Sequence, residues 1–392
     1  LVSPLGIDKE EFVQGLSRGG RPAGPPSSFS TDTTTCKTCF EVPAFDAVKY
    51  LRVKIKKILD RCSKMGLMAA QQAFDDAGLD EGQIANTGIV ISTALGSMTN
   101  TSLFDRQRIT EGPDNVSPMQ FPTTILNSHA ANINIHFGIP QTCITFSSIQ
   151  TGSLDAIAYA TQLIQAGRLE TVLAGGMEEL SESCFLALDR LNLLASNGIS
   201  APFYKQSTGV LLGEGAGVLL LEERDHAVAR GATILAEIKG SGMAFGVDPI
   251  NPAKNAFKSA ILNAARQANV GFGDMDAIYS GATGNKQQDG FEFNTLKGIF
   301  NLEEVPVTSI KKHTGECLGA SGAFAVASAT LSLTGQLFPS FHDPMDDDPN
   351  NYLVPMVKDN KIKAIRNCLV CSSCVSGAGS AIVMSRHDKG TI

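Results

Sequence analysis

Residues 142–160 read TCITFSSIQTGSLDAIAYA, and their pattern predicts a strand that runs directly into a helix. Residues 142–148 are apolar and β-branched without helical spacing, which is typical of a buried strand. From Gly152 the apolar residues recur at i, i+3 and i+4, so a helix is expected to begin there. Gln150 therefore lies in a sharp turn that suits a nucleophile, because free N–H groups and the helix dipole activate a thiol and stabilise an oxyanion. The amide of glutamine neither ionises near neutral pH nor attacks a thioester.

Residues 149–156 resemble the active-site segment of β-ketoacyl synthases, with Gln150 at the position of their nucleophilic cysteine. Glutamine at this position also marks the non-catalytic partner subunit of type II polyketide synthases, the chain length factor. The resemblance covers nearly the whole chain, through further segments at residues 2–6, 59–61, 72–79, 175–178 and 213–222.

Short apolar strands alternate with helices along the chain, which predicts α/β layers with mixed sheets. The resemblance implies more: a thiolase-like fold of five layers, α-β-α-β-α, made of two similar halves. We place these ketosynthase-like halves at residues 1–230 and 231–392.

The two other catalytic segments of the family are altered. The loop at residues 281–285 resembles the family's His-Gly-Thr-Gly-Thr loop with Gly281 at the histidine. Residues 311–319 resemble its Lys-x-x-x-Gly-His-x-x-Gly segment, with Lys311 retained and Glu316 at the second histidine. Residues 371–377 lack the phenylalanine of the family's gating loop.

These changes remove the expected chemistry. The two family histidines stabilise the enolate that forms when a malonyl thioester loses CO₂, and removal of one such donor costs about 100-fold to 1000-fold in rate. A carboxylate at Glu316 would repel the enolate unless it is protonated or paired with Lys311.

Three other interpretations of the turn remain. Ser147 or Ser148 would be a nucleophile if His313 were its base. Decarboxylation alone is a second possibility, since some synthase-like loading domains carry glutamine at this turn, although they keep their histidines. In the third, Gln150 is a plug that pairs with free backbone groups at the helix start.

Composition narrows the class of protein. With 392 residues, 43% hydrophobic and 18% charged, the chain is long enough for a large core. We expect a cytoplasmic protein, because no apolar run approaches the ~18 residues that span a bilayer and no secretory signal is visible. The net charge of −7 argues against nucleic acid as a partner.

The cysteines are expected to be free thiols. The pair Cys36 and Cys39 and the cluster at residues 368–374 have zinc-compatible spacing. They are far apart in sequence, and buried thiols are normal in a reducing cytosol. We therefore expect no metal and no cofactor.

A basic stretch in the first half is the local exception to the acidic character. It is either a solvated face or, as in the resembling synthases, a docking surface for acidic acyl carrier protein. The residues proposed for docking are Lys54, Lys56, Lys57 and Arg61.

A partner is expected from the resemblance. Synthase-like subunits pair through the strand that leads into Gln150, so this chain would form a heterodimer with a catalytic ketosynthase. In chain length factors, bulky residues of one helix limit the polyketide chain in a tunnel at that interface. The matching positions are Met98, Thr101, Phe104 and Asp105, at one-turn spacing, unless this face is ordinary interface packing.

The sequence thus predicts a non-catalytic ketosynthase-like subunit, a chain length factor, for type II polyketide or polyene biosynthesis. The alternative is a free-standing enzyme, either a malonyl-carrier-protein decarboxylase or an atypical acyltransferase.

Overall fold

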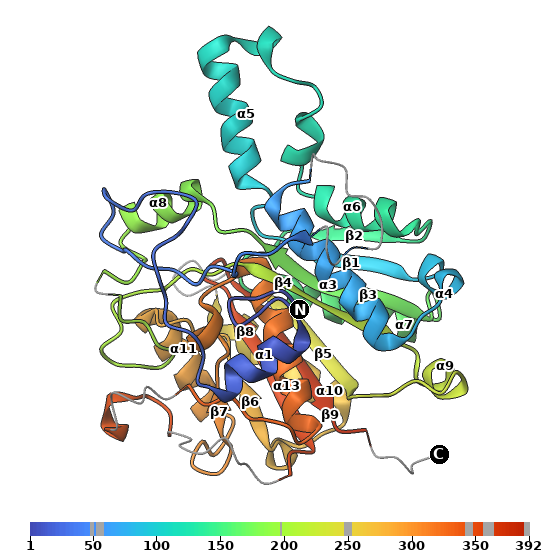
Figure 1. The fold of residues 1–392 in the computed structure, drawn as a ribbon. Coiled ribbons are helices and arrows are strands. Elements are labelled where there is room, and N and C mark those ends of the chain that lie inside the picture. Colours follow the sequence, from blue (N-terminus) through green and yellow to red (C-terminus); the bar gives the residue numbers. More distant parts are fainter. Residues whose placement is uncertain are drawn as a thin grey trace.

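A computed structural model describes residues 1–47, 51, 59–196, 198–246, 253–341, 348–355 and 364–387. Two mixed sheets form its framework (Figure 1). The first has the order β2-β1-β3-β4, with strands β1 (Gly88–Ser92), β2 (Cys143–Phe146), β3 (Thr171–Glu178) and β4 (Gly215–Glu222). The second has the order β5-β9-β8-β6-β7, with strands β5 (Glu237–Phe245), β6 (Ala277–Tyr279), β7 (Val307–Thr308), β8 (Asn367–Ser373) and β9 (Ala378–Ser385).

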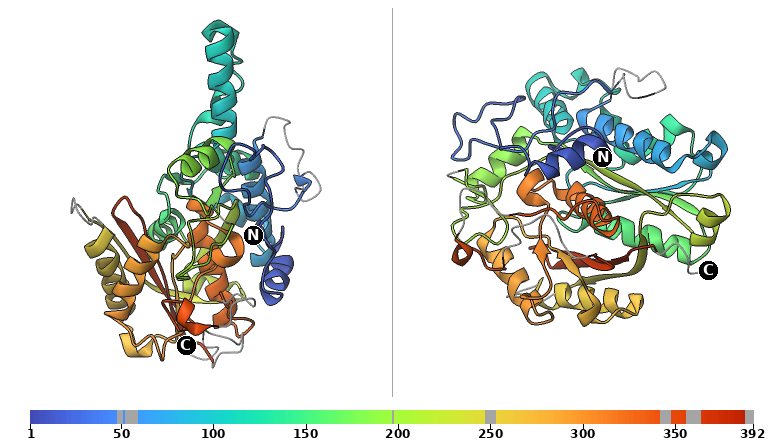
Figure 2. Two further views of the ribbon diagram at one scale, coloured as in Figure 1. Left: turned by 90° about the vertical axis from the view of Figure 1, so that its left-hand side faces the viewer. Right: turned by 60° about the horizontal axis from the view of Figure 1, so that its bottom comes forward.

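Helices cover both sheets on both faces. The first sheet packs on α3 (Arg61–Ala77) and α6 (Ser128–Phe137), and the second on α10 (Ala253–Ala268) and α11 (Lys286–Lys297). Between the sheets lie α7 (Gly152–Gln165) and α13 (Ser321–Leu333), whose side chains belong to the central core (Figures 1 and 2). The predicted five-layer, thiolase-like fold is confirmed.

The two halves share a topology. In each sheet two parallel pairings join three strands, β2-β1-β3 and β7-β6-β8, and the third strand pairs antiparallel with the next, β4 or β9. The break near residue 231 stays a prediction; α9 (Arg224–Ala229) precedes it and β5 follows.

The remaining helices lie at the periphery and in the connections. They are α1 (Lys9–Ser17), α4 (Glu81–Ala85), α5 (Met98–Glu111), α8 (Glu182–Arg190) and α12 (Lys311–Thr314), with 3₁₀ turns η1 (Pro113–Asn115), η2 (Phe121–Thr124), η3 (Phe272–Asp274), η4 (Leu318–Ala320) and η5 (Pro349–Asn351). Among the described residues, no helix is long and apolar enough to cross a membrane.

Residues 98–127 project from the body as an arm made of α5 and the return through η1 and η2 (Figures 1 and 2). No residue of these three elements is buried. Large apolar side chains are exposed along the arm, at Leu103, Ile109, Met119, Phe121, Ile125 and Leu126. Exposed apolar patches mark protein or membrane contacts, ligand grooves or surfaces prone to aggregation.

Of the proposed docking residues, Lys54, Lys56 and Lys57 lie outside the described residues. Arg61 begins α3, and its guanidinium Nε donates to Glu214 Oε2 over 3.0 Å. Glu214 is fully buried and also accepts from the N–H groups of Val42 and Leu180. Arg61 therefore has a structural role as the counter-charge of a buried carboxylate.

Arg61→Met is expected to lower the free energy of unfolding by about 2–3 kcal/mol, because it leaves Glu214 buried without a cation. Urea unfolding measures the loss. Arg108→Met is the control, since its pair with Asp105 is half exposed, and it should cost less than about 0.5 kcal/mol. Equal losses in the two variants would contradict this role of Arg61.

Candidate functional site: a closed polar network

Gln150 lies in the turn between β2 and α7, as the sequence predicts. Its side chain is buried, with 8% of the residue exposed, and its backbone carbonyl accepts from Ser372 Oγ over 3.2 Å. The turn thus packs against β8 of the second half. This buried position carries an amide, which is not a nucleophile.

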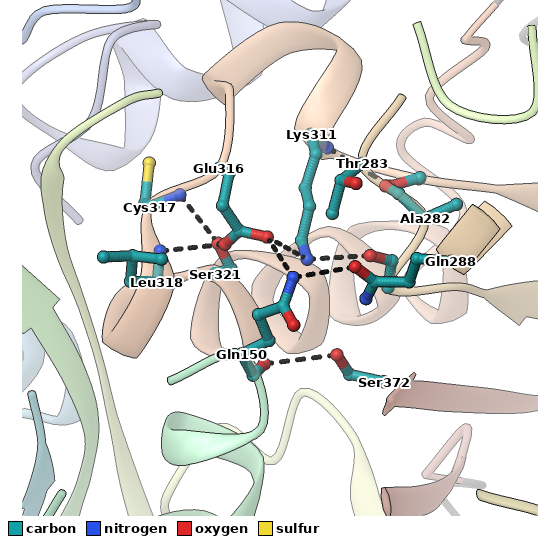
Figure 3. A network of polar contacts seen from close by, with 12 residues as sticks. Gln150, Ala282, Thr283, Gln288, Lys311, Glu316, Cys317, Leu318, Ser321 and Ser372 are labelled. Carbon is teal, nitrogen blue, oxygen red and sulfur yellow. Dashed lines mark hydrogen bonds and ion pairs between the residues drawn. The ribbon is translucent and has the colours of Figure 1, made fainter. Parts of the chain in front are cut away.

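The side chain of Gln150 joins a network that spans both halves (Figure 3). Its Nε2 donates to Gln288 Oε1 over 3.0 Å and to Glu316 Oε2 over 3.3 Å. Gln288 Nε2 in turn donates to the carbonyl of Ser373 over 2.9 Å. Among the described residues Gln150 Oε1 has no hydrogen-bond partner.

Lys311 and Glu316 form an ion pair at the centre of this network. Lys311 Nζ donates to Glu316 Oε2 over 2.8 Å and to the carbonyl of Gly281 over 2.8 Å (Figure 3). The second carboxylate oxygen, Oε1, accepts from Leu318 N–H and Ser321 Oγ. Both carboxylate oxygens of Glu316 therefore accept hydrogen bonds, and its charge is paired with Lys311, the lysine of the family pattern that this chain keeps.

Gly281 follows β6 in a position that has no room for a side chain. A Cβ atom there would lie 2.8 Å from Ser372 Cα and would also overlap Ser372 Oγ. Real Cβ atoms do not approach other heavy atoms this closely, because van der Waals repulsion rises steeply below the normal contact distance. The histidine position is thus closed by the neighbouring strand as well as lacking its imidazole.

The loop after Gly281 is held by a buried carboxylate. Asp289 accepts from the N–H groups of Thr283, Gly284 and Phe203 over 2.8–3.0 Å. Burial raises the pKa of Asp289 to about 7. This carboxylate joins the backbone of Thr283 and Gly284 to that of Phe203 in the first half.

Sequence reasoning missed Gln288 and Ser372. Gln288 follows Lys286 and Gln287 at the start of α11, a polar run that resembles a solvated helix end. Ser372 lies in the segment that resembles the gating loop, where the sequence gives no sign of a contact with Gln150. In the sequence, Gln288 stands seven residues after Gly281. This spacing indicates a place near Gln150 only once the geometry of the loop after β6 is known.

The serine and His313 interpretation is wrong. His313 is buried, its Nε2 lies 2.8 Å from the Ser340 carbonyl, and its Nδ1 faces Gly20. Burial lowers its pKa to about 4. Ser147 Oγ donates to the carbonyl of Ala94 over 3.3 Å. His313 therefore serves packing and supplies no base for the turn.

The predicted tunnel residues lie apart from the network, on the arm. Met98 begins α5, and Thr101 Oγ1 donates to the carbonyl of Ser97. Phe104 contacts Phe121 across the arm, with ring centroids 6.2 Å apart. Asp105 pairs with Arg108. The structure places these residues on one helix and keeps them out of the polar network.

The predicted zinc-compatible cysteines do not gather with other potential ligands in the described part of the chain. One buried grouping does, Asp60 with Cys62 and His129. Asp60 caps α3, and its two carboxylate oxygens accept from Ser63 N–H and Ser63 Oγ. His129 Nδ1 lies 2.9 Å from the same Ser63 Oγ, so Asp60 and His129 both contact Ser63 at the start of α3.

Gly281→Ala is expected to lower the free energy of unfolding by about 1–3 kcal/mol through overpacking. Gly290→Ala is the control, since space around that α11 position is open and alanine favours a helix.

For the same steric reason, the triple variant Q150C/G281H/E316H should show no condensation of acyl and malonyl carrier-protein substrates. Measurable product from it would show that the site adapts to a histidine.

Comparisons with known proteins identify the family of this chain. The model of the beta-ketoacyl synthase N-terminal domain matches residues 1–227, and that of the C-terminal domain matches residues 235–343. A 3-oxoacyl-(acyl-carrier-protein) synthase 2 of Vibrio harveyi is 30% identical over 95% of this chain and 93% of its own length. The tetracenomycin polyketide synthase ketoacyl synthase beta subunit of Streptomyces glaucescens is 28% identical over 99% of this chain and 97% of its own.

Solved structures show the same fold. The ishigamide ketosynthase/chain length factor superposes with a TM-score of 0.90 at 25% identity and covers 99% of this chain and 97% of its own. A type II polyketide synthase ketosynthase in complex with its acyl-carrier protein superposes with a TM-score of 0.85 at 24% identity over 99% and 97%. The chain belongs to the beta-ketoacyl synthase family and has its thiolase-like fold.

Proposed function

We propose that this chain is a non-catalytic ketosynthase-like subunit, a chain length factor, that pairs with an active β-ketoacyl synthase in type II polyketide or polyene biosynthesis. The observation that supports this proposal is the closed polar network around Gln150. Its nucleophile position is an amide, Gly281 has no room for a side chain, and Glu316 is bound to Lys311.

The chemistry of condensation needs what this site lacks. An acyl-enzyme requires a group that attacks the thioester, and the buried amide of Gln150 has none. The enolate needs preorganised donors, whereas the group at residue 316 is an anion whose oxygens are already occupied. Relatives named as 3-oxoacyl synthases include catalysts, so the inference rests on these residues and not on the fold.

A surface for pairing is supported by the first sheet. Strand β2 is its edge strand and leads into Gln150, and its residues are half-buried or exposed. An unpaired strand edge offers a row of N–H and C=O groups to another strand. The arm adds exposed apolar side chains beyond the same sheet (Figure 1).

The proposed partners follow from this role. They are a catalytic ketosynthase at the β2 edge, an acyl carrier protein, and a growing polyketide chain in a tunnel at the interface. The basic residues Lys54, Lys56 and Lys57 remain candidates for carrier-protein contact.

Cys143 provides a native reporter of pairing, because it is exposed in β2 whereas Cys184 is half-buried and the other seven cysteines are buried. A catalytic ketosynthase added in excess should slow maleimide labelling of Cys143 by about tenfold or more, since pairing covers the strand edge. Labelling is followed by mass spectrometry, with Cys143→Ser as the control. The proposal fails if no cysteine-bearing ketosynthase slows the reaction, or if the isolated chain releases CO₂ from malonyl carrier protein. The second outcome would instead identify the decarboxylase.

Met98→Ala or Phe104→Ala should lengthen the products of the purified complex, because a smaller side chain opens the proposed tunnel. Product length is read by mass spectrometry. Leu103→Ala is the matched control on another face of α5 and is expected to weaken pairing without changing length. An unchanged product profile from the Met98 and Phe104 variants would refute their role.

A further inference from the structure

Two adjacent carboxylates at the end of β3, Glu178 and Glu179, hold the root of the arm. The root is the segment from Thr93 to Thr99, which connects β1 to the first turn of α5. Both glutamates are buried, with 1% and 7% of each residue exposed. Buried carboxylates are retained only where hydrogen bonds or charges compensate their desolvation.

Glu178 accepts hydrogen bonds from both halves of the molecule. From the root it receives Ala94 N–H over 2.6 Å, Leu95 N–H over 3.1 Å and Thr93 Oγ1 over 3.3 Å. From the second half it receives Gly319 N–H over 3.3 Å. One side chain thus ties the root to the segment that carries Glu316.

The contact between these segments leaves little freedom. A Cβ atom on Gly319 would lie 2.8 Å from Thr93 Cα and 2.9 Å from Ala94 N. The segment after Glu316 therefore packs directly on the backbone of the root. Movement of the root would require the loss of this contact and of the bonds to Glu178.

Glu179 supplies the cap that α5 itself lacks. The N-cap residue Ser97 makes no side-chain capping bond, and its hydroxyl is buried without a partner among the described residues. Instead Glu179 Oε1 accepts from Thr99 N–H over 2.8 Å. The free N–H groups of a helix start need an acceptor, and here it comes from the neighbouring strand.

We propose that Glu178 and Glu179 are positioning residues that fix the direction in which the arm leaves the body, and hence the surface that the arm presents to its partner. This inference rests on the proposed function for its consequence, but the anchoring itself concerns the isolated chain. Neither residue belongs to the polar network around Gln150.

The backbone N–H groups bond to one side-chain oxygen of Glu179 but to both oxygens of Glu178. Variants of the two residues can therefore separate the loss of an acceptor from the loss of charge. Glu179 uses Oε1 for Thr99 N–H, so Glu179→Gln keeps the acceptor and Glu179→Leu removes it. Glu178 uses both oxygens, so Glu178→Gln must turn an NH₂ group toward backbone donors. Glu182→Leu is the control, since this residue is exposed in the first turn of nearby α8.

Hydrogen exchange of the isolated chain tests the anchoring. Glu179→Leu and Glu178→Gln should speed exchange in residues 94–103 by about tenfold, while Glu179→Gln and Glu182→Leu stay within about twofold of wild type. Unchanged exchange in Glu179→Leu and Glu178→Gln would overturn the inference. Uniformly faster exchange over β3 and α7 would also overturn it, because it would indicate general destabilisation.

Sedimentation with a catalytic ketosynthase tests the consequence. Glu179→Leu should raise the dissociation constant by about tenfold, and Glu179→Gln should restore wild-type pairing. If the exchange changes but pairing does not, the positioning role for the partner surface is wrong. If the wild-type chain pairs with no ketosynthase, the proposed function fails, whereas the exchange result still decides the anchoring.

Discussion

The buried ion pair between Lys311 and Glu316 is the constraint on which the rest of the site depends. Their side chains are only 4% and 3% exposed, so neither charge is stabilised by bulk water. Desolvation of each ion costs several kcal/mol, which is offset only when the remaining groups are also satisfied. Gly281 carbonyl, Leu318 N–H, Ser321 Oγ and the Gln150 amide meet that need. The altered positions therefore support one another.

Because these positions depend on one another, the function of the chain is sought outside the polar network around Gln150. Polar side chains occupy the space where acyl chemistry would take place, and Ser372 closes the histidine position. Among the described residues, the β2 edge has no further strand paired to it and the arm exposes large apolar side chains. Glu178 connects the arm to the polar network, because it binds the root of the arm and Gly319 of the segment that carries Glu316.

Local patterns predicted much of this. The strand, turn and helix around Gln150 and the α/β layers follow from local patterns. The five-layer arrangement and the altered positions Gln150, Gly281 and Glu316 are implied by the resemblance of short segments to the family. The sequence does not reveal the structural role of Arg61, because nothing near it in sequence shows that its partner is the buried Glu214. Its role in docking stays a prediction. Gln288 was missed for a related reason, since a polar helix start is usually solvated.

The sequence by itself determined the α/β layers and the amide at the turn between β2 and α7, because periodicity and side-chain chemistry are local properties. Only the tertiary structure decided which residues contact Gln150 in this turn. Gln150 meets Gln288 and Glu316 across 138 and 166 residues, and Ser372 across 222. Such contacts depend on how two halves pack, and close packing then fixes which side chains fit.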